Sequence, residues 1–149
     1  MVDTTFIAKS TIDEIIEELI DNFNAAKELG NEFLYQTLID YGKFIGDYPK
    51  ALMTDEFKIH NCQSTVYIQG LVKNNRLYLQ GYADSKLVQG QVAVLLKIFN
   101  GQKVDEILNS DDSLKRFVQE TNIIATLTPS RQNAFGSMFE HIKRLAKKQ

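Results

Sequence analysis

The chain has 149 residues and a formal net charge of -2, and 44% of its residues are hydrophobic. This length and composition are typical of one globular domain with its own core. A slightly acidic chain has no strong positive field with which to neutralise phosphates, so we expect no nucleic-acid partner. The sequence shows no apolar run of membrane-spanning length and no signal-peptide pattern at its start, which predicts a cytoplasmic protein without a membrane segment.

The first predicted helix follows residues 1–9, which we expect to be a loose lead-in. Thr11 and Glu14 have the spacing of a capping box. Apolar residues then recur at helical spacing and predict one buried stripe. The stripe consists of Ile12, Ile15, Ile16, Leu19, Ile20 and Phe23. A glycine–asparagine pair at 30–31 interrupts the pattern, and a second helix is predicted over 32–45.

The middle of the chain predicts a hairpin. Residues 50–61 show no sustained period and are expected to form a loop. If the following stretch is extended, Cys62 shares a face with Val66, because side chains alternate along a strand. Asn74-Asn75 can adopt the positive φ of a tight turn, and residues 76–82 are the expected partner strand.

The third long helix is predicted to start after Asp84 and to run to about residue 100. Its apolar residues occupy most of its sides, so it should be the central buried helix. Asp84 comes just before it and is expected to cap it. Gly101 suits the position that follows a helix C-terminus.

Shorter helices are predicted around 104–108 and 113–120, and a last long helix begins at Thr128-Pro129, an N-cap followed by proline. Strands in mid-chain with helices on both sides indicate the α+β class. We expect a small antiparallel sheet of about three strands, covered by helices, in a single domain spanning 1–149.

Cysteine chemistry is the most distinctive possibility in this sequence, because Cys62 is the only cysteine. A thiolate attacks persulfides and disulfides at a rate that depends on its ionised fraction and its accessibility. A single cysteine cannot form an intramolecular disulfide. With only His60 and His141 besides, and no zinc-ligand spacing, it gives no ordinary metal site. Composition alone favours a small buried apolar role for this residue.

Three short segments carry a resemblance: Asn61-Cys62-Gln63-Ser64, then Gly81-Tyr82-Ala83-Asp84, then Leu127-Thr128-Pro129-Ser130-Arg131. Their order and spacing resemble the SufE family of sulfur acceptors over roughly residues 32–145. The resemblance implies that Cys62 takes sulfur, as a persulfide, from a cysteine desulfurase. It further implies that the sulfur goes on to an iron–sulfur scaffold for cluster assembly.

The same resemblance implies supporting roles for Gln63, Ser64, Asp84 and Arg131, at the site or toward the partner. It implies no cofactor in this chain, because the desulfurase would hold the pyridoxal phosphate. Asn61 stands where the family usually has glycine, and asparagine also tolerates left-handed backbone.

Two other functions stay open on the sequence alone. The chain could be an interaction module whose Cys62 is structural. It could also be a thiol hydrolase in which His60, two residues before Cys62, accepts the thiol proton. His141, on the last helix, is expected at the surface.

Overall fold

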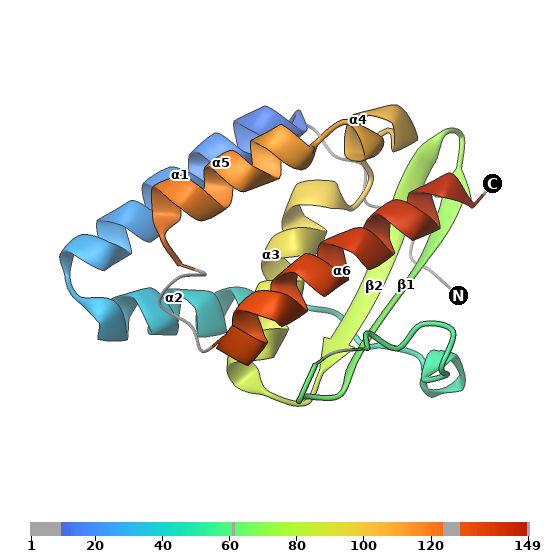
Figure 1. Cartoon of the computed structure of the whole chain (residues 1–149), viewed down its shortest axis with the longest axis horizontal. Helices are drawn as coiled ribbons and strands as arrows, with labels where there is room; N and C mark the ends of the chain where they lie inside the picture. Colours follow the sequence, from blue (N-terminus) through green and yellow to red (C-terminus); the bar gives the residue numbers. More distant parts are fainter. Residues whose placement is uncertain (1–9, 61, 124–128, 149) are drawn as a thin grey trace.

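The computed structural model describes residues 10–60, 62–123 and 129–148, so the expected lead-in over residues 1–9 lies outside it. Figure 1 shows the order of the elements along the chain. They are α1 (Ile12–Glu28), α2 (Asn31–Gly42), the 3-10 helix η1 (Lys50–Leu52), β1 (Val66–Lys73), β2 (Arg76–Ala83), α3 (Lys86–Phe99), α4 (Val104–Leu108), α5 (Asp111–Thr121) and α6 (Pro129–Lys147).

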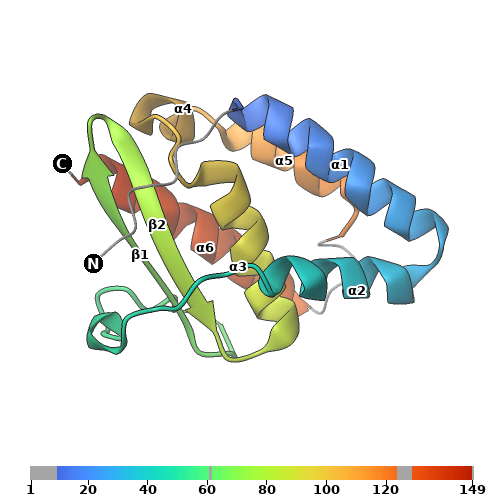
Figure 2. The ribbon, with the colours of Figure 1, turned by 180° about the vertical axis from the view of Figure 1, so that it is seen from behind.

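The elements stack in layers, with the β1–β2 hairpin at one side of the molecule (Figures 1 and 2). α6 contacts β1, α3 contacts β2, and the two helices contact each other. α1, α2 and α5 lie beyond α3, away from the hairpin. α3 is therefore the central element, and most of its residues are buried, as the sequence predicts. The α+β class is confirmed.

The hairpin has the predicted turn. Asn74 and Asn75 have φ values of 53° and 63°, which asparagine tolerates better than most residues. β1 and β2 pair antiparallel, with Val66 opposite Ala83 at the far end from the turn. The residues that face the helices are buried, so one face of the hairpin joins the core.

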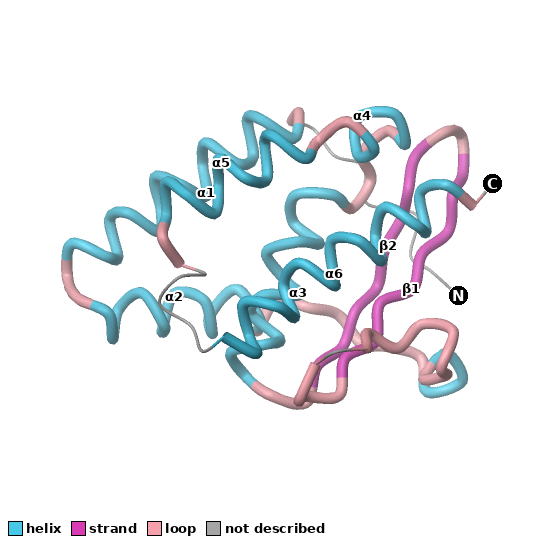
Figure 3. The backbone as a smooth tube through the Cα atoms, viewed as in Figure 1, coloured by secondary structure: helices cyan, strands magenta, loops and turns pink. Residues whose placement is uncertain are grey.

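The sheet has two strands in the described residues, where about three were expected. Lys58 forms an isolated bridge with Tyr67 beside β1, and Arg76 forms one with Lys103 beside β2. These flanking segments pair over too few residues to form strands. Figure 3 shows the described residues between α2 and β1 as loop apart from η1.

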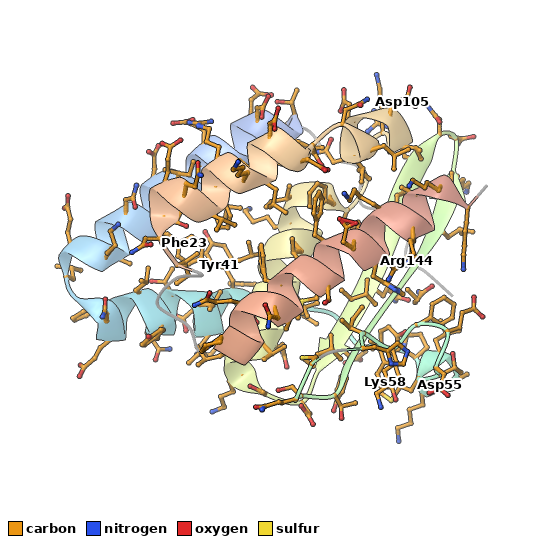
Figure 4. All side chains as sticks on the ribbon, in the orientation of Figure 1. Phe23, Tyr41, Asp55, Lys58, Asp105 and Arg144 are labelled. Atoms are coloured by element: carbon orange, nitrogen blue, oxygen red, sulfur yellow. The ribbon has the colours of Figure 1, made fainter. Side chains whose placement is uncertain are left out.

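The N-terminal helix begins with the predicted capping box. The Glu14 N–H donates to Thr11 Oγ1 at 3.2 Å, and the Thr11 N–H donates to Glu14 Oε1 at 2.9 Å. The whole predicted stripe is buried. The Phe23 ring lies 5.4 Å from that of Tyr41 on α2 (Figure 4) and 6.0 Å from that of Phe117 on α5. The stripe thus joins α1 to both neighbouring helices.

A glycine sets the close crossing of α2 and α3. A Cβ atom on Gly90 would lie 2.2 Å from the carbonyl oxygen of Leu38, so only glycine fits. The Gln89 side chain also donates to the Gly42 carbonyl at 2.8 Å. α2 ends at Gly42 rather than at residue 45, and the next residues form tighter i→i−3 turns. Among the described residues, no helix is both long and apolar enough to cross a membrane.

Candidate functional site

Cys62 lies between residues 57–59, which hydrogen-bond to β1, and the start of β1 at Val66. We call Cys62 and its described neighbours His60, Gln63 and Ser64 the cysteine loop. The Ile59 N–H donates to the Val66 carbonyl at 2.9 Å, which joins the residues on either side of the loop. Hydrogen-bonded segments open less readily than the loop between them. The residues that flank the cysteine loop are therefore held by a backbone hydrogen bond.

A second pair of hydrogen bonds holds the end of this loop. The Thr65 N–H donates to Asp84 Oδ1 at 3.0 Å, and the Asp84 N–H donates to the Thr65 carbonyl at 3.1 Å. We call this pair the Asp84–Thr65 clamp. It ties the cysteine loop to the turn between β2 and α3.

The clamp corrects the expected role of Asp84. The N-cap of α3 is Ser85, and it makes no side-chain cap hydrogen bond. A capping side chain accepts from the N–H two or three residues ahead. Asp84 lies one residue before the N-cap, and its carboxylate turns back to Thr65 instead. The prediction that Asp84 caps α3 is therefore wrong, while its predicted role toward the site or the partner stays a prediction.

The Cys62 side chain is half-buried and packs against the hydrophobic core. Gln63 next to it is exposed, and Ser64 is half-buried. The predicted shared face with Val66 assumed an extended strand, but β1 begins at Val66 and residues 62–65 lie outside it. The core supports the cysteine on one side, and its neighbour Gln63 lies at the surface.

A hollow of about 780 Å³ lies between this loop and α6, and we call it the α6 hollow. Ile59 and His60 line it from the loop side. Arg144 lines it from α6, on the side of the helix near the loop that carries Asp55 and Lys58 (Figure 4). The other lining residues, all on α6, are Gln132, Asn133, Gly136, Ser137, Phe139 and Glu140.

Arg131 lies in the first turn of α6, one residue before Gln132 of the hollow lining. The side chain of Arg131 is outside the described part of the structure, and so are Asn61 and Thr128. The roles predicted for Arg131 and Asn61 therefore stay predictions. α6 begins at Pro129, the residue that the sequence placed at its first turn.

The expectation that His141 lies at the surface is wrong. Its exposed fraction is 7%, and its Nε2 lies 2.8 Å from the Ile68 carbonyl, which requires the proton on Nε2. Burial lowers the pKa of His141, and the Ile68 carbonyl offsets this only in part. The nearby cations Arg144 and Lys148 lower that pKa further. His141 thus joins α6 to β1 as a neutral ring.

Among residues 10–60, 62–123 and 129–148, no three His, Cys, Asp or Glu side chains gather as metal ligands would. The chemistry that the described site offers is that of the Cys62 sulfur. Nearby lie the amide, hydroxyl and charged side chains of the α6 hollow.

Comparisons with known proteins agree with the resemblance. The sequence model of the SufE family, described as "Fe-S metabolism associated domain", matches residues 17–146. An uncharacterized SufE-like protein of Rhizobium meliloti is 30% identical over 132 residues, which are 86% of this chain and 91% of the relative. One from Synechocystis is 27% identical, over 94% of this chain and 85% of the relative.

Two further similarities concern a named relative and a solved fold. The "Cysteine desulfuration protein SufE" of Wigglesworthia glossinidia brevipalpis is 26% identical over 86% of this chain and 87% of its own length. The solution structure of a hypothetical protein from Thermus thermophilus superposes with a TM-score of 0.72 at 16% identity. That match covers 90% of this chain and 94% of the other. At this identity the structural match shows the fold alone.

Proposed function

This chain belongs to the SufE family of Fe-S metabolism associated domains, and from that premise we propose that Cys62 accepts sulfur from a cysteine desulfurase. The persulfide would then deliver its sulfur to an iron–sulfur scaffold in the cytoplasm. One observation carries the assignment to this residue. The only cysteine of the sequence lies in the short loop that the Asp84–Thr65 clamp holds in place.

The proposed reaction is an exchange at sulfur. The Cys62 thiolate attacks the outer sulfur of a persulfide on a cysteine of the partner. A new bond forms between Cys62 Sγ and that sulfur, and the sulfur–sulfur bond of the partner breaks. The partner's cysteine leaves as a thiolate, so no external oxidant or reductant is needed. The reaction consumes one thiolate and one persulfide and produces one thiolate and one persulfide.

The half-buried position of Cys62 fits a carrier rather than an open thiol. Oxidants attack exposed thiolates most readily, so contact with the core protects the sulfur between partners. Transfer requires the two sulfur atoms to meet, which a rearrangement of the cysteine loop would permit. The hydrogen bonds that flank the loop limit this movement to a few residues.

The catalytic chemistry that releases sulfur from free cysteine would belong to the partner. The desulfurase would hold pyridoxal phosphate and form the first persulfide. This chain would supply the acceptor sulfur and the surface that positions it. We therefore treat it as a transpersulfidation partner rather than an independent enzyme.

The test uses a cysteine desulfurase, free cysteine and intact mass measurement. We expect wild type to gain one or more sulfur atoms that a reductant removes, and Cys62→Ala to gain none. Equal sulfur uptake by the alanine variant would refute the assignment of the acceptor.

The contact of Cys62 with the core also favours a second candidate, an interaction module in which the cysteine is structural. Cys62→Ser separates the two functions, because it keeps a small side chain but removes the sulfur. An interaction module would keep its partner binding and its effect on the partner. A sulfur acceptor would keep binding and lose transfer.

A further inference from the structure

We propose that a second copy of this chain docks on the surface at the C-terminal end of α2. A pocket of about 610 Å³ lies there, between the end of α2, β2 and α3. We call it the α2 pocket. Phe44 borders it, two residues after the end of α2. Apolar residues line it on all three sides, namely Tyr41, Ile45, Leu79, Ala93 and Leu96.

The α2 pocket lies beside the most exposed large apolar side chain that the structure describes. The exposed fraction of Phe44 is 88%. Phe33, about three helical turns earlier, is 52% exposed and lies on roughly the same side of α2. Single exposed apolar residues are normal, but exposed apolar residues gathered beside an apolar pocket indicate an interaction surface. Burial of the Phe44 ring in such a pocket is favourable.

The exposed ring and the pocket belong to the same surface, which makes that surface self-complementary. In a dimer with two-fold symmetry, the same patch of both copies meets. A two-fold axis next to Phe44 would place the ring of each copy over the α2 pocket of the other. Because each copy supplies both the ring and the pocket, the contact closes after two chains.

The charges of the pocket lining also match a second copy. Asp47 is exposed on the segment after α2, and the Lys97 side chain on α3 is 39% exposed. Two-fold symmetry reverses the order of these two residues in the other copy, so each charge can approach its opposite. Lys97 lies 3.8 Å from Glu18, but an exposed pair of this kind is weak and can exchange. With one acid and one base among its described residues, the lining does not attract a strongly charged partner.

This surface lies apart from the cysteine loop. Figure 2 shows α2 on the near side of α3 and α6 behind it. None of the described residues that line the α2 pocket belongs to α6 or to the cysteine loop. Association through the α2 pocket therefore does not use the residues around Cys62, and the inference does not depend on the proposed function.

The experiment measures mass by sedimentation equilibrium over a range of protein concentrations. Phe44→Ser removes the exposed ring without adding a charge. Leu71→Ser is the matched control, because Leu71 is also exposed, at 45%, but lies on β1 outside the pocket. Asp47→Lys and Lys97→Asp each place like charges against one another across a two-fold interface. An equimolar mixture of these two variants again offers opposite charges at both contacts.

We expect wild type to form a dimer in a concentration-dependent way, with a dissociation constant about tenfold or more higher for Phe44→Ser. Leu71→Ser should match wild type. The mixture of the two charge variants should associate more tightly than either variant alone. A wild type that is monomeric at every concentration, a dimer that Phe44→Ser leaves unchanged, or a mixture no tighter than its components would each overturn the proposal. Loss of sulfur uptake by Phe44→Ser without a change in mass would assign the surface to a different protein, and would also overturn it.

Discussion

Asp84 and Thr65 hold each other through two hydrogen bonds, one from each backbone N–H, and so fix the end of the cysteine loop. Asp84→Ala removes the carboxylate that accepts the Thr65 N–H. We expect the free energy of unfolding to fall by about 0.5–1.5 kcal/mol, the usual net value of one hydrogen bond. Sulfur transfer to Cys62 should slow, because the loop loses one anchor.

Asp84→Asn is the control for this prediction, since its side-chain carbonyl can still accept the Thr65 N–H. It should keep most of the stability and of the transfer rate. Urea denaturation and single-turnover transfer measure the two effects. An alanine variant that matches wild type in both would show that the clamp is not needed.

The crossing of α2 and α3 depends on Gly90. Gly90→Ala forces a Cβ atom against the Leu38 carbonyl, and because this neighbour is backbone the helices must separate. We expect a loss of stability of about 1–3 kcal/mol or more by chemical denaturation. Gly136→Ala, also within a helix but in open space, should instead stabilise by about 0.5–1 kcal/mol. Equal stability of the two variants would contradict the close approach.

His141 should make stability depend on pH. Its pKa is lowered in the folded state, so the unfolded chain binds a proton that the folded chain resists. The stability that neutral His141 contributes is present above its unfolded pKa of about 6.5 and is lost as the pH falls through its lower folded pKa. His141→Gln keeps a donor for Ile68 without this titration. Denaturation curves at several pH values should show a shallower decline for the variant, and identical declines would exclude His141 as the cause.

Partial burial should slow the alkylation of Cys62. Thiol reagents need an accessible thiolate, and contact with the core restricts access. We expect slower labelling in the native protein than in the same protein in denaturant. Labelling should become faster in the presence of a desulfurase variant that lacks its own reactive cysteine. Native labelling at the denatured rate would mean that the loop stands open.

Local signals in the sequence predicted much of the fold. The Thr11–Glu14 capping box, the Asn74-Asn75 turn and Gly101 after α3 depend on a few adjacent residues, and all three are confirmed. The periodicity of α1 and α3 predicted their buried faces because each helix packs along its whole length. About three strands were expected, and the described residues contain two. The segment beside β1 forms only an isolated bridge, and the length of such pairing depends on contacts with residues distant in sequence.

The candidate site was predicted only as a set of residues. No local pattern indicates that Asp84 holds Thr65, nineteen positions earlier, rather than α3. The hollow was also missed, since it requires α6 to lie beside the loop of His60. Helical spacing does contain a signal for His141, which lies three residues after the buried Met138 and four before the buried Leu145. Histidine is usually only partly buried, so His141 was expected at the surface despite this spacing.

The most direct test of the central claim is a single-turnover transfer followed by intact mass of both proteins. A desulfurase is loaded with persulfide, freed of cysteine and mixed with this protein. We predict that the partner loses the mass of one sulfur atom at the rate at which this chain gains it, and that peptide mapping places the gain on Cys62. Loss of sulfur from the partner without a matching gain on Cys62, or an equal gain by Cys62→Ala, would contradict the account.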